Sequence, residues 1–340
     1  SDLESFEYIN SFDKELNENQ LLAGGEGLVE SHSHDGGFSE TTAASFSADF
    51  AIGAVDGNAN EAVTAGYSFQ IDLTTSFTGE DSFDVSIDAG NADDGSLDEL
   101  DLNDSGDGLT VDGVSYTFPL GDKMTAFVGD NMDGSTLYST ACVYGGVTDT
   151  LDDCGNATSA LGGGSGTAAG ASYEIGNGFT AAFGYTGNGA TGLATDQGAD
   201  AYGGQLTYTA DSYGASVTYA NSEEGGDATY WGLNGYWTPA ETGTAVPSVS
   251  VGYEMADPDV GADTDQWFVG LQWDEAGPGV FGAAIGSNGP TSDNDDELTM
   301  FEAYYSYPIN DGMTITPLIY LEEQNGDDET GFMVKTSFAF

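Results

Sequence analysis

The chain has 340 residues, of which 58 are acidic and three are lysines, and its formal net charge is −55. A charge of this sign and size argues against nucleic acid and anionic membrane surfaces as partners. The 39% hydrophobic and 12% aromatic content argues against disorder, and 51 glycines with only 8 prolines suit many short strands joined by tight turns. No stretch approaches the roughly 20 apolar residues of a membrane helix, so a membrane-spanning structure would be a closed barrel.

Residues 1–37 show no strand-like alternation and are predicted to form a separate N-terminal segment. Four apolar residues recur at helical spacing, which favours a short amphipathic helix: Phe6, Ile9, Phe12 and Leu16. His32 and His34, followed by Asp35, could bind a metal ion. Two histidines among glycine and serine are more typical of a solvated linker.

Alternation of apolar and polar residues begins near Phe38 and continues to the end of the chain. A period of two residues places neighbouring side chains on opposite faces of a strand. Five strands are predicted before a long insertion, at about 41–54, 63–73, 83–88, 114–118 and 123–129. The second shows the cleanest pattern, because every other residue from Val63 to Leu73 is apolar.

The insertion at 131–166 contains the only two cysteines, Cys142 and Cys154. Two cysteines without a histidine nearby cannot form a zinc site alone. A disulfide that closes a small loop is the favoured interpretation, and it implies an oxidising compartment such as the periplasm or the cell surface.

Eleven more strands are predicted after the insertion. They lie at about 171–175, 179–185, 202–208, 213–219, 231–237, 249–253, 267–273, 281–285, 301–307, 313–321 and 331–340. The strand at 313–321 has an ambiguous face. The total of sixteen is even, as in bacterial single-chain outer-membrane barrels.

The last strand shows why these faces point to a membrane. Phe332, Val334, Phe338 and Phe340 share one face, and the other carries small or charged residues. An apolar face on a free C-terminal strand is an aggregation hazard in water. It is accounted for if that face contacts lipid and the strand closes a barrel.

Connection lengths predict the topology. Joins after even-numbered strands are mostly short, and those after odd-numbered strands are usually longer and more acidic. Short periplasmic turns with long outer loops are typical of outer-membrane barrels, which places both termini on the periplasmic side. A water-soluble sandwich also alternates. Sixteen strands would then require two domains, and no linker interrupts residues 38–340.

Three short stretches resemble cyanobacterial outer-membrane porins related to the carbohydrate-selective porin family. They are Phe38-Ser-Glu-Thr-Thr42, Ser76-Phe-Thr-Gly-Glu80, and Tyr116-Thr-Phe-Pro-Leu-Gly-Asp122 with the following Phe127-Val-Gly129. The resemblance implies a pore-forming barrel over residues 38–340. Family members usually carry a surface-layer homology domain and a helical segment that bind peptidoglycan, and residues 1–37 are too short for both. In general porins the loop after the fifth strand folds into the barrel, so 131–166 is a candidate constriction, with an ordinary surface loop as the alternative.

Charged residues on the face opposite the lipid-facing one are predicted to line the pore: Asp49, Asp72, Asp84, Asp88, Glu174, Glu254, Glu302 and Lys335. Singly, each is explained by solvation of a wet wall. Together, carboxylates without an opposing arginine create a negative potential, because low-dielectric walls focus the field. Rings of Asp and Glu favour cations.

Two acidic stretches rich in glycine are candidate Ca²⁺ sites, because hard cations prefer oxygen ligands. The candidate ligands are Asp93, Asp94, Asp98, Asp101, Asp104, Asp107, Asp257, Asp259, Asp263 and Asp265. Neither stretch has EF-hand spacing, and solvated acidic loops explain them equally well.

The sequence thus predicts an all-β transmembrane antiparallel barrel of about 16 strands at residues 38–340, preceded by a periplasmic segment at 1–37. The predicted function is a cation-preferring diffusion porin of a Gram-negative outer membrane, most simply a homotrimer in contact with lipid and lipopolysaccharide. No cofactor is required and no enzyme activity is predicted. The alternatives are a porin that prefers a solute such as a sugar or iron, and a secreted Ca²⁺-binding β protein acting in adhesion or structure.

Overall fold

The computed structural model describes residues 42–58, 61–92, 95–100, 102–103, 105–156, 159, 161, 166–195, 198–223, 226–241, 245–293 and 295–340. The amphipathic helix and the histidine pair predicted within residues 1–37 lie outside this part of the chain. The strands are β1 (Thr42–Asp56), β2 (Thr64–Thr75), β3 (Ser82–Gly90), β4 (Thr110–Pro119), β5 (Met124–Met132), β6 (Gly166–Gly176), β7 (Phe179–Gly187), β8 (Asp200–Thr209), β9 (Tyr213–Ser222), β10 (Ala228–Trp237), β11 (Ser248–Pro258), β12 (Thr264–Ala276), β13 (Gly279–Ser287), β14 (Thr291–Ser292), β15 (Thr299–Asn310), β16 (Met313–Glu322) and β17 (Glu329–Ala339). The short helices are η1 (Gly95–Leu100) and α2 (Asp149–Asp152).

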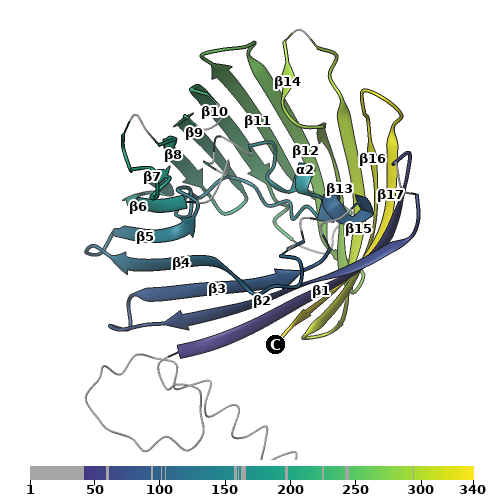
Figure 1. Ribbon diagram of the computed structural model, residues 1–340, viewed down its shortest axis with the longest axis horizontal. Helices are drawn as coiled ribbons and strands as arrows, with labels where there is room; N and C mark the ends of the chain where they lie inside the picture. The colour runs from purple at the N-terminus through teal and green to yellow at the C-terminus, as the bar shows by residue number, and fades with distance from the viewer. Residues whose placement is uncertain are drawn as a thin grey trace, which may run out of the picture.

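Sixteen of these strands form one closed antiparallel barrel, in which each pairs with its neighbours in the chain (Figure 1). The remaining strand, β14, is a two-residue extension that pairs with the start of β12. Among the described residues, no helix is long and apolar enough to cross a membrane. The predicted fold class and strand number are confirmed.

The C-terminal strand closes the barrel. β17 pairs with β16 on one side and with β1 on the other, from Ser47 opposite Ala339 to Asp56 opposite Thr330. Beyond the last strand residue, the backbones of Phe46 and Phe340 exchange two hydrogen bonds of 2.9 and 3.0 Å. Their rings stack with centroids 5.6 Å apart. The aromatic C-terminus therefore extends the closing seam by one residue pair.

The strand faces differ as alternation requires. Large apolar side chains remain exposed on the outer face, for example Phe50 and Ile52 on β1, Leu206 on β8, Leu233 on β10 and Phe332 on β17. The register places the alternate positions of adjacent strands together on the inner face, such as Ala51 opposite Lys335. β16 has the same alternation, with Thr316, Leu318 and Tyr320 buried inside the barrel. This resolves the face that the sequence leaves ambiguous.

The two rims of the barrel also differ. Phe340 and the first residue of β1 lie at the rim of the short turns, which include 177–178, 277–278 and 311–312. One longer turn at this rim is fixed by Asp81, whose carboxylate accepts hydrogen bonds from Ser76, Thr78 and Tyr116. Burial alone would raise the pKa of Asp81, but these hydrogen bonds outweigh it and hold the pKa below its usual range. The long connections, 91–109 and 133–165, leave the opposite rim.

Candidate functional site

The connection after β5 folds into the barrel (Figure 1). Its backbone runs along the inner face of the wall, where its amides donate hydrogen bonds to polar side chains of several strands. The amide of Ser139 donates to Gln205 Oε1 on β8 at 2.7 Å, Ala141 donates to Ser216 Oγ on β9 at 3.0 Å, and Val143 donates to Ser250 Oγ on β11 at 3.0 Å. We call the described residues 133–156, Ser159 and Leu161 the inner loop. The wall side chains thus satisfy these three backbone donors of the loop.

Glu302 on β15 anchors the middle of the inner loop. One carboxylate oxygen accepts the Tyr144 hydroxyl at 2.6 Å, and the other accepts the Thr148 hydroxyl at 2.8 Å and the Thr148 amide at 3.0 Å. The Val147 amide adds a longer contact of 3.4 Å. Only 1% of the Glu302 surface is exposed. A buried carboxylate is stabilised by several donors of this kind, so Glu302 is a clamp for the loop.

Glycines on the wall allow this close approach. A Cβ at Gly252 on β11 would lie 1.5 Å from the carbonyl oxygen of Cys154, and one at Gly232 on β10 would lie 2.0 Å from Asn156 Nδ2. A side chain at Gly252 would displace the loop backbone from the wall, and one at Gly232 would require the side chains of Asn156 and Ser159 to move.

The two cysteines form a disulfide across the inner loop, with their Cα atoms 6.5 Å apart. The enclosed segment carries Tyr144 and Thr148, which contact Glu302. Cys154 is fully buried and belongs to the apolar cluster inside the barrel. The predicted disulfide is present in the structure, and it encloses the clamped segment.

A second connection, after β3, also enters the barrel, contrary to its prediction as an acidic outer loop. Leu97 and Leu100 of η1 are 2% exposed and pack with Val55 of β1 and Met333 of β17 in the internal cluster. η1 contacts β1, β2 and α2. Two leucines within a run of aspartates are the sequence signal that could have predicted this burial, because large apolar side chains are usually buried.

Glu99 joins the two inward connections, since its Oε2 accepts the Thr150 hydroxyl at 3.2 Å. Burial, together with the nearby carboxylates of Glu322, Asp98 and Asp149, raises the pKa of Glu99 to about 7, although the Thr150 hydrogen bond lowers it in part. These groups come from β16, η1 and α2. The folded protein therefore retains a proton here that an unfolded chain would release at lower pH.

We expect the contact between η1 and α2 to weaken as the pH rises through about 7. Between the ordinary carboxylate pKa of 4.5 and the raised value of about 7, the folded state binds more protons than the unfolded state, so its stability falls as the pH rises and the proton is lost. Current fluctuations of single channels should increase from about pH 6 to about pH 8. The variant Glu99→Gln should remove this dependence, whereas Asp98→Asn, which removes one of the charges that raise the pKa of Glu99, should retain it with a midpoint at lower pH. A wild-type channel with no change across this range would contradict the expectation.

The wall opposite the inner loop is acidic. The register places Asp49 on β1, Asp72 on β2, and Asp84 and Asp88 on β3 on the inner face. Gln70 Nε2 and Ser86 Oγ donate to Asp72 at 2.8 and 2.7 Å; Thr74 and Ser82 donate to Asp84 at 2.8 and 2.6 Å; and Thr110 donates to Asp88. We call these four aspartates the acidic wall. In the described part of the chain, the side chains that donate to Asp72, Asp84 and Asp88 are all neutral.

The other predicted pore residues are placed differently. Glu174 on β6 is exposed near the turn rim, and Lys335 lies on the inner face of β17 opposite Ala51 and Thr316. Glu254 points inward but is only 2% exposed, because the inner loop covers it and the Ser159 amide donates to its Oε2. Glu254 and Glu302 therefore bind the loop rather than face open water.

Asp112 is an acid that sequence reasoning missed. It lies at the irregularity in the register between β3 and β4, and it interacts electrostatically with Asp88 and Asp72. Simple alternation does not place a residue at a bulge, because one strand carries an extra residue there.

The candidate Ca²⁺ ligands do not converge in the described part of the chain, where no group of three or more metal-binding side chains comes together. Asp93, Asp94, Asp101 and Asp104 lie outside the described residues. Asp98 belongs to η1, Asp107 accepts the Tyr67 hydroxyl at 2.9 Å, and Asp265 accepts the Tyr253 hydroxyl at 2.8 Å. Asp257, Asp259 and Asp263 are exposed at the loop rim.

No protein-family profile matches the chain, and no curated protein matches it. Solved structures do. OprB of Pseudomonas putida is 12% identical with a TM-score of 0.64, over 88% of this chain and 94% of that one. An anion-selective porin from Comamonas acidovorans is 14% identical with a TM-score of 0.63, over 88% and 99%. A variant of the Rh. blastica porin is 12% identical with a TM-score of 0.58, over 88% and 100%. At these identities the similarity establishes the fold alone: the chain has a porin-like barrel.

Proposed function

We propose that this barrel is a diffusion channel of a bacterial outer membrane that passes small hydrophilic solutes and favours cations over anions. The observation that carries the proposal is the acidic wall, which faces a barrel interior narrowed by the inner loop and bears carboxylates whose donors are neutral. The apolar outer face suits a lipid environment.

Electrostatics supports the sign of this preference. A narrow interior with low-dielectric walls focuses the field of its fixed charges, and the chain has three lysines against 58 acids. The structurally similar Comamonas porin is described as anion-selective. Because selectivity depends on the charged side chains that line a pore, the charges on the inner face of this barrel are expected to decide it.

The setting we propose follows from the same barrel. The first residue of β1 and the C-terminal Phe340, which both lie at the turn rim, would face the periplasm. The loop rim would face outward, in contact with lipopolysaccharide. Sixteen-stranded porins provide the precedent for a homotrimer. Membership of the cyanobacterial porin family, which the three short stretches of sequence suggest, remains a prediction.

A planar-bilayer measurement tests the function. Purified protein should produce discrete conductance steps, and in a KCl gradient the reversal potential should have the sign for K⁺ over Cl⁻. An anion-selective channel would overturn the proposed preference, and a preparation that folds but never conducts would overturn the channel itself.

A further inference from the structure

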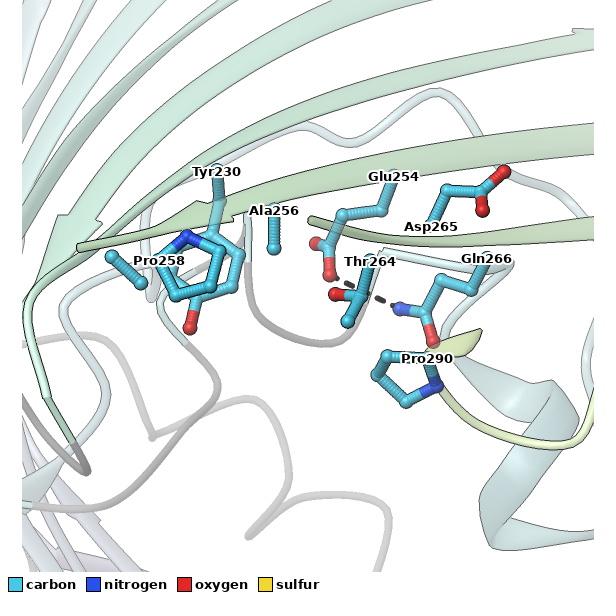
Figure 2. A pocket seen from close by; sticks show the side chains of 9 residues that line it. Tyr230, Glu254, Ala256, Pro258, Thr264, Asp265, Gln266 and Pro290 are labelled. Atoms are coloured by element: carbon cyan, nitrogen blue, oxygen red, sulfur yellow. Dashed lines mark hydrogen bonds between the residues drawn. The ribbon is translucent and has the colours of Figure 1, made fainter. Parts of the chain in front are cut away.

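A cavity of about 240 Å³ lies near the loop rim, over the inner faces of β10, β11 and β12 (Figure 2). Tyr230, Ala256 and Glu254 lie on adjacent strands of this face, because Tyr230 pairs with Ala256 and Glu254 pairs with Gln266. Pro290, from the connection after β13, also lines the cavity. A cavity of about 150 Å³ accommodates benzene, so this one has room for a small organic molecule.

The lining has an apolar part and an acidic part. Alanine, proline and the ring of Tyr230 provide the apolar part. Glu254 provides a carboxylate that is 98% buried, and Figure 2 shows it pointing into the same space as Thr264 and Gln266. Gln266 donates its amide to Glu254 at 3.1 Å, which leaves its carbonyl oxygen as an acceptor. The residues that line the cavity include two carboxylates and no lysine, arginine or histidine.

We infer that this cavity binds a small organic ammonium cation, with the ammonium group at Glu254 beside the ring of Tyr230 and the carbon chain against the alanines and prolines. A buried carboxylate attracts a donor that carries charge, and an aromatic face attracts a cation within about 6 Å. A bare metal ion fits less well, because no cluster of three metal-binding side chains exists in the described residues, and the apolar lining offers no ligands. The inference needs only the folded barrel and does not rest on the ion selectivity proposed above.

Calorimetric titration of the purified barrel in detergent at constant ionic strength tests it, with n-butylammonium chloride as the probe and 1-butanol as its neutral counterpart. The ammonium should bind saturably and the alcohol should not. Glu254→Gln should weaken binding by a factor on the order of ten. Asp84→Asn removes the same charge from another part of the inner face and should change binding little.

A second pair of variants separates the role of the ring from any disturbance of the loop that Glu254 also holds. Tyr230→Phe keeps the aromatic face and should retain the affinity, whereas Tyr230→Leu should weaken it on the order of threefold. Resistance of each variant to unfolding in SDS before heating reports an intact barrel. Absence of saturable binding, equal binding of 1-butanol, or equal losses in the Glu254 and Asp84 variants would each overturn the inference.

Discussion

Replacing Glu302 by alanine is expected to raise single-channel conductance and to make the open current noisy. The substitution removes the acceptor of the Tyr144 hydroxyl and of the hydroxyl and amide of Thr148. Each buried donor left without an acceptor costs roughly 1–3 kcal/mol. The inner loop should then leave the wall for part of the time, and the interior it occupies should open to ions.

Matched variants separate this effect from damage to the barrel. Glu302→Gln keeps one acceptor and should have a smaller effect, and Asp311→Ala removes an exposed carboxylate beyond the end of the same strand. Reduction of the disulfide alone should leave the clamp in place, whereas reduction of the Glu302→Ala protein should free the enclosed segment further. Unchanged conductance in a well-folded Glu302→Ala channel would show that the inner loop does not limit the current.

The strands and their faces could be predicted from the sequence because alternation is a local property. Val63 to Leu73 shows both the strand and its outer face within eleven positions, and the confirmed β2 spans Thr64–Thr75. The role of the last strand in closing the barrel could also be predicted from the last ten residues, because a C-terminal strand with an exposed apolar face is an aggregation hazard unless it is paired and its face contacts lipid.

The clamp could not be predicted in the same way. Glu302 and Tyr144 are 158 positions apart, and alternation shows only that Glu302 points inward. Whether an inward acid meets water or a folded loop depends on the path of another segment. The same limit applies to Glu254, because the Ser159 amide that covers it is 95 positions away in the sequence.

The connection after β3 shows a different limit. Its aspartates favoured a cation site in an outer loop, yet Leu97 and Leu100 anchor it inside the barrel. The free energy gained by burying two leucines outweighs the preference of the nearby acids for solvent. An acid in this segment can still reach solvent, as the exposed side chain of Asp98 does. An apolar cluster thereby fills part of the interior, and the open path is expected to follow the acidic wall.

Removing the charge of the acidic wall is expected to abolish most of the cation preference. The triple variant Asp72→Asn, Asp84→Asn and Asp88→Asn keeps the size of the side chains and an acceptor for the neighbouring hydroxyls. For a perfectly selective monovalent channel, a tenfold gradient gives a reversal potential of about 59 mV. The wild-type potential should be a large fraction of that value, and the triple variant should move it to about half or less.

A second triple variant provides the control, with Asp257, Asp259 and Asp263 at the loop rim each changed to asparagine. It also removes three negative charges, but from exposed positions outside the barrel interior. Salt should screen these rim charges first, because the Debye length falls from about 10 Å at 0.1 M to about 3 Å at 1 M. At high salt the rim variant should therefore match the wild type, while the wall variant should still be less selective. Equal shifts in both variants at every salt concentration would assign selectivity to the net charge of the molecule, and the acidic wall would have no specific part in it.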